Sequence, residues 1–75
     1  MIEKIREVVA GYMGMRVSEI KDEQSFLDIS MDSLTLLKII IELEQVFNIR
    51  IENDEIVEIR TILDIFNLME KKISQ

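Results

Sequence analysis

The chain has 75 residues, one domain at most by the usual domain sizes, so a deep catalytic cleft with its own scaffold does not fit. It has no cysteine and no histidine, which excludes disulfides, thiolate nucleophiles, zinc sites built on those ligands and a Ser-His-Asp triad. With 9 basic and 15 acidic residues, its net charge of −6 disfavours nucleic acids and anionic membranes and favours a basic partner surface.

The N-terminal stretch alternates charges and shows no apolar core of a signal peptide. The longest aliphatic runs, such as Ile39–Ile41, are far shorter than the roughly 20 residues that a spanning helix needs. We therefore expect a cytoplasmic protein that does not insert into membranes.

The first predicted helix covers about residues 2–13. Its apolar side chains recur at helical spacing, and these are Ile2, Ile5, Val8, Val9 and Tyr12. Gly14 is expected to end it in the left-handed conformation. Residues 15–32 then lack a sustained period and predict a long first loop, anchored by burial of Phe26 and allowing a short turn at Ser18–Ile20.

The strongest helical pattern covers residues 33–47, with Asp32 or Ser33 as the N-cap. Apolar residues recur at steps of three and four, namely Leu34, Leu37, Ile40, Ile41 and Val46 or Phe47. Three more, Leu36, Ile39 and Leu43, widen this face, so we expect the helix to be central.

A connector over 48–53 leads to a short predicted helix over about 54–59, capped by Asn53 or Asp54. Thr61 should cap a last helix over about 62–73, with Asp64 in a capping-box arrangement. Its expected buried residues are Ile62, Ile65, Phe66, Met69 and Ile73. The prediction is an all-α, small four-helix bundle with three longer helices and one short helix, in a single domain over 1–75.

The sharpest local feature is Asp32-Ser33-Leu34, where the long loop meets the central helix. Free backbone N–H groups and the helix dipole make such a place receptive to an anion, for example a phosphate ester on Ser33. Helix capping alone also explains the triplet, because aspartate and serine are routine caps.

The wider stretch Phe26-Leu27-Asp28-Ile29-Ser30-Met31-Asp32-Ser33-Leu34 resembles the attachment site of the acyl and peptidyl carrier proteins, whose pattern is roughly F-x-[DE]-[LI]-G-x-D-S-[LM]. Segments 42–47, 49–51 and 59–62 are similar to that family's second helix end, connector and entry to the last helix. The resemblance covers nearly the whole chain.

That resemblance implies a free-standing, non-enzymatic acyl or aminoacyl carrier protein. A phosphopantetheinyl transferase would attach 4′-phosphopantetheine from coenzyme A to Ser33, and the thiol of that arm would hold the cargo as a thioester. Asp32 would position the site and Leu34 would anchor the helix start. Further implied partners are a loading enzyme and downstream acyl-transfer or synthase enzymes, and the carrier is expected to be a monomer without a metal.

Three features depart from the family pattern. Ser30 stands where the family usually has glycine, which costs about 1 kcal/mol if the position needs a positive φ. Thr35 and Lys38 stand where carriers of fatty acid synthesis commonly have acidic residues. The stretch from Phe26 to Ser33 is also one residue shorter than in those carriers. These departures favour a dedicated pathway, such as polyketide, nonribosomal peptide or aminoacyl transfer.

Within this interpretation, a ring near the arm should face partner enzymes, made of Met31, Asp32, Leu34, Leu37 and Ile56. Glu42 and Glu44, with Glu55 and Glu58, could form an acidic docking face or a merely solvated one. The wide apolar face of the central helix could line a pocket for an acyl chain, although a filled core explains it as well.

Other chemistry is excluded by spacing. Ser33 and Lys38 diverge around a helix and do not form the S-x-x-K arrangement of serine-lysine nucleophiles. Residues 53–58 lack the central glycine of a calcium loop. The remaining rival is an unmodified acidic interaction module with a carrier-like fold, which binds a basic or amphipathic helix.

Overall fold

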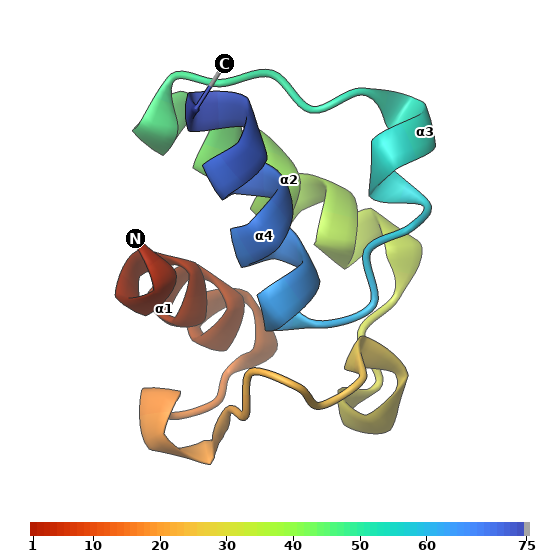
Figure 1. Cartoon of the computed structure of the whole chain (residues 1–75). Coiled ribbons are helices and arrows are strands. Elements are labelled where there is room, and N and C mark those ends of the chain that lie inside the picture. The colour runs from red at the N-terminus through yellow and green to blue at the C-terminus, as the bar shows by residue number, and fades with distance from the viewer. Residues whose placement is uncertain (75) are drawn as a thin grey trace.

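The computed structural model describes residues 1–74 and confirms the all-α class, with three longer helices and one short helix. Helix α1 (Ile2–Met13) packs against both α2 (Ser33–Phe47) and α4 (Ile62–Ile73), while the short α3 (Asn53–Ile56) lies to one side (Figure 1). The molecule measures 32 × 22 × 19 Å. No helix of the described residues is long and apolar enough to cross a membrane.

The ends of α1 and α2 follow from their cap residues. Gly14 has φ 65° and donates its N–H to the carbonyl of Ala10, which closes α1. Asn48 has φ 53° and ends α2 in the same way, because asparagine tolerates the left-handed region better than most residues. Thr61 and Asp64 form the expected capping box of α4, with the Thr61 hydroxyl accepting from the Asp64 N–H at 3.0 Å.

The long first loop contains two 3₁₀ helices, η1 (Val17–Glu19) and η2 (Phe26–Ile29), and is fastened at three points. The Arg6 guanidinium donates to both carboxylate oxygens of Asp22 at 2.7 and 2.6 Å. The Asp22 carbonyl accepts from Leu63 N–H at 3.0 Å, and the Arg60 carbonyl accepts from Phe26 N–H at 2.8 Å. These contacts hold the loop against α1 and against the entry to α4.

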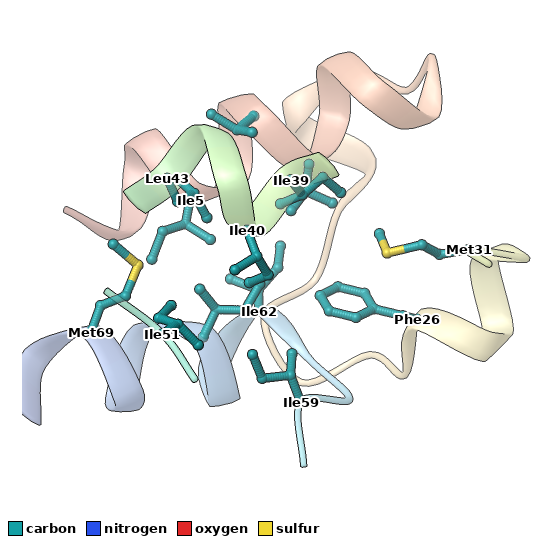
Figure 2. Packing of buried hydrophobic residues seen from close by; sticks show 13 residues of the cluster. Ile5, Phe26, Met31, Ile39, Ile40, Leu43, Ile51, Ile59, Ile62 and Met69 are labelled. Atoms are coloured by element: carbon teal, nitrogen blue, oxygen red, sulfur yellow. The ribbon is translucent and has the colours of Figure 1, made fainter. Parts of the chain in front are cut away.

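The core is one hydrophobic cluster to which all three long helices contribute. Figure 2 shows Phe26 of η2 pointing toward Ile40 and Ile62, and Met31, which follows η2, pointing toward Ile39. Phe26 is buried, as expected of the loop anchor. Burial of this apolar surface is the main stabilising term for so small a domain.

Two sequence-based expectations about α2 and α4 are wrong in part. The core face of α2 is formed by Leu36, Ile39, Ile40, Leu43 and Phe47, whereas Leu34, Leu37, Ile41 and Val46 are exposed. Ile73, expected in the buried face of α4, is also exposed, because it lies at the helix end.

The short helix also differs from its expected bounds of 54–59. It begins at Asn53 with Glu52 as the N-cap, and the Glu55 carboxylate accepts a hydrogen bond from the Glu52 N–H at 2.8 Å. It ends at Ile56. After the Val57 N–H, the N–H groups of Glu58 and Ile59 bond three residues back, to the carbonyls of Glu55 at 3.2 Å and Ile56 at 3.1 Å. This tighter turn leads the chain to Ile59, which is buried in the core.

Candidate phosphopantetheine attachment site

The site lies where the long loop enters α2, and Asp32 is its N-cap. The Asp32 carboxylate accepts from the Thr35 N–H at 2.7 Å, so Asp32 rather than Ser33 makes the capping bond. This backbone hydrogen bond is the main cause that lowers the pKa of Asp32; the Thr35 side chain and the positive charge of Lys38 lower it further. Asp32 is therefore a carboxylate at neutral pH.

Ser33 is the first residue of α2, and its side chain is exposed. Among residues 1–74 its hydroxyl has no hydrogen-bond partner, since Asp32 already caps the helix. The N–H groups of Ser33 and Leu34 at this helix start also lack a protein partner within that part of the chain. The hydroxyl is thus free to be modified beside two donors that suit an anion.

A pocket of about 220 Å³ adjoins Ser33. Phe26, Met31, Leu36 and Ile59 supply its apolar surface, while Asp32 and Arg60 supply opposite charges. Such a lining fits a group with an anionic end and a less polar remainder. The residues present therefore fit a phosphate-linked arm on Ser33.

Two of the site residues predicted from sequence, Met31 and Leu34, differ from their expected burial. Met31 is only 7% exposed and belongs to the core, so the expectation that it faces partners is wrong for this structure. Leu34 is 59% exposed and therefore does not anchor the helix start by burial. Leu37 is 40% exposed, as a docking residue must be, and Ile56 is half-buried.

The two glutamates assigned to docking both make contacts within the domain. Glu42 accepts from the Tyr12 hydroxyl at 3.1 Å, which links α2 to α1 and raises the pKa of Tyr12. Glu44 accepts from the Ile51 N–H at 2.8 Å and fixes the connector that leads to α3. Both residues thus have structural roles that sequence spacing did not reveal.

The structure adds two residues that the sequence reasoning did not assign to the site. Leu27 is 83% exposed and lines the pocket, because the 3₁₀ turn buries its neighbour Phe26 and turns Leu27 outward. Arg60, just before the N-cap of α4, lines the same pocket. A long-range hydrogen bond joins Phe26 N–H to the Arg60 carbonyl, and a local sequence pattern does not contain such a contact.

Comparison with known proteins agrees with this geometry. Residues 3–69 match the family model described as the phosphopantetheine attachment site. The acyl carrier protein of Clostridium acetobutylicum is 31% identical over 71 residues, which cover 93% of this chain and 92% of that protein. The crystal structure of an acyl carrier protein from Thermotoga maritima superposes with a TM-score of 0.82 at 28% identity, covering 95% of this chain and 84% of that one.

The chain belongs to the phosphopantetheine attachment family, with the fold and function of an acyl carrier protein. It is a non-catalytic carrier with a covalently attached 4′-phosphopantetheine, and it interacts with biosynthetic enzymes. The rival interpretation as an unmodified interaction module is not favoured.

Proposed function

We propose that Ser33 is the residue that bears the 4′-phosphopantetheine arm. The observation that supports this is its exposed hydroxyl at the first position of α2, without a hydrogen-bond partner among residues 1–74. When bound, the arm supplies a thiol that holds an acyl or aminoacyl group as a thioester, which a chain without cysteine cannot supply itself.

Asp32 and the start of α2 prepare this position. Asp32 fixes the first turn through Thr35, which holds the backbone of Ser33 at the start of the helix. The Asp32 carboxylate also stays negatively charged beside Ser33. A phosphopantetheinyl transferase with a basic surface would be attracted to this charge.

The test is intact-mass measurement after incubation with coenzyme A and a promiscuous phosphopantetheinyl transferase. Wild type should gain the mass of one phosphopantetheine and Ser33→Ala should gain none. Ser30→Ala and Ser25→Ala are matched controls, since both serines lie in the same loop and should leave the modification intact. An unmodified wild type with several competent transferases, or a modified Ser33→Ala, contradicts the proposal.

Partner enzymes would bind the exposed side of α2 that follows Ser33 along the helix. Leu34, Leu37 and Ile41 share this side, opposite the core face, and all three are exposed. Ile56 and the acidic groups Glu42 and Glu44 flank it in this proposal. We expect a monomer that meets a loading enzyme and downstream acyl-transfer or synthase enzymes in turn, in the cytoplasm.

Lys38 lies among these exposed residues of α2 and favours a dedicated pathway over general fatty acid synthesis. A basic enzyme patch that suits an acidic α2 would be repelled by a lysine at this position. Lys38→Glu should therefore raise kcat/KM with fatty acid synthesis enzymes by about one order of magnitude, the effect of a like-charge contact worth roughly 1.4 kcal/mol. Unchanged kinetics would remove Lys38 as a determinant of the pathway.

A further inference from the structure

Arg60 is the one arginine without an acidic partner in the part of the chain that the structure describes. Arg6, Arg16 and Arg50 each have a carboxylate oxygen within 4.0 Å, whereas Arg60 has none among residues 1–74. Arg60 is exposed, and it is one of the residues that line the pocket beside Ser33. An arginine without an acidic partner in that part of the chain therefore lines the same pocket as the attachment position.

The backbone of Arg60 is held on both sides, so its side chain starts from a fixed place. The Arg60 N–H donates to the Asp64 carboxylate at 2.9 Å, which belongs to the capping system of α4. The Arg60 carbonyl accepts from Phe26 N–H at 2.8 Å, within the loop that leads to Ser33. These two bonds tie the entry of α4 to the attachment loop.

A cation near Ser33 would reduce the repulsion between the negative charges at this site. A phosphodiester on Ser33 would add a negative charge beside the Asp32 carboxylate, in a protein whose net charge is already −6. The helix start offers partial charges, and Lys38 is a cation that already acts on Asp32, so a second cation on the pocket side would offset the added charge. A guanidinium offers a planar pair of donors that matches phosphate oxygens, and its long side chain can adjust to reach them.

We propose that Arg60 binds the phosphodiester that joins the arm to this chain, an inference that rests on the proposed attachment at Ser33. In this arrangement Arg60 holds the near end of the arm against the pocket formed by Phe26, Met31, Leu36 and Ile59. The remainder of the arm is left free to reach partner enzymes. Arg60 is thus a positioning residue for the attached group.

The experiment compares apo and fully modified protein by NMR, with complete modification confirmed by intact mass. In wild type, modification should shift the side-chain Nε–H signal of Arg60 and leave that of Arg16 in place. The ³¹P signal of modified Arg60→Gln should shift away from that of modified wild type. High salt should reduce the wild-type effect, because it screens an exposed ion pair.

Arg16→Gln is the matched control, since it removes the same charge from an exposed arginine in the first loop. Its modified form should keep the wild-type ³¹P signal, and Arg60→Lys should give a value between wild type and Arg60→Gln. Overlapping apo spectra of all variants establish that each is folded. Wild type that is modified but shows no change at Arg60 overturns this inference alone, while wild type that no transferase modifies overturns the proposed function with it.

Discussion

Ser30 has the backbone conformation for which glycine is best suited. Its φ of 60° and ψ of 32° place it in the left-handed region at the end of η2, three residues before Ser33. Its side chain is exposed and makes no hydrogen bond among residues 1–74 that would compensate. The strain expected from the departure at this position is therefore present in the structure.

Ser30→Gly should raise the free energy of unfolding by about 1 kcal/mol, because glycine adopts positive φ without a steric penalty. Urea denaturation of the apo protein measures this. Gly14→Ala is the converse control at φ 65° and should lower stability by a similar amount, although a Cβ there meets no atom within 4 Å. Equal stability of Ser30→Gly and wild type would mean that the loop takes another path in solution.

At the scale of elements, periodicity predicts where α2 begins and ends but not which side it buries. The helix over 33–47 carries apolar residues on two opposite sides. Amphipathicity alone therefore does not show which of the two sides is buried. Packing against α1 and the position of the loop decide, and they bury Ile40 while leaving its neighbour Ile41 45% exposed. The second apolar side is the surface that we assign to docking.

Ile40 and Ile41 form a matched pair for testing which side of α2 is buried. Ile40→Ala should cost about 2–5 kcal/mol of stability, since it leaves a cavity in a fully buried site. Ile41→Ala should change stability by roughly 0.5 kcal/mol or less, because its side chain is partly in water already. Denaturant unfolding distinguishes the two, and equal losses would contradict the orientation of α2.

For the whole molecule, the ion pair between Arg6 and Asp22 fastens the first loop and predicts sensitivity to acid. The hydrogen bonds from Arg6 are the main cause that lowers the pKa of Asp22 below its ordinary value of 3.8. A lowered folded-state pKa stabilises the fold above the ordinary pKa, and this contribution is lost as the pH falls through the folded value.

The difference in melting temperature between wild type and Asp22→Asn should therefore be largest near neutral pH and shrink below about pH 4. Thermal unfolding across this range measures it. Asp28→Asn removes the same charge from an exposed aspartate that makes no ion pair within the described chain, and so controls for net charge. A difference that persists unchanged into strong acid would contradict a role for the ion pair.

Net charge gives a second prediction at this scale. A charge of −6 on a domain only 32 Å long implies self-repulsion that screening relieves. Added sodium or magnesium chloride should raise the melting temperature of the apo protein. A melting temperature that is constant across salt concentrations would show that the acidic residues are too dispersed to repel one another measurably.

The whole fold also explains how much of the site could be predicted from sequence. The attachment serine and its aspartate cap are adjacent in the chain, so a local motif contains both. Arg60 lines the same pocket through contacts between segments far apart in the chain, such as that between residues 26 and 60. Met31, expected in the docking ring, is instead buried in the core. Both outcomes depend on tertiary packing, which a local sequence pattern does not contain.

The most direct test of the central claim is tandem mass spectrometry of the protein isolated from its native host. Fragmentation should place one phosphopantetheine, with any cargo, on Ser33 and on none of Ser18, Ser25, Ser30 or Ser74. A chain that carries the arm on another residue, or that is found without it under every growth condition, would contradict the account.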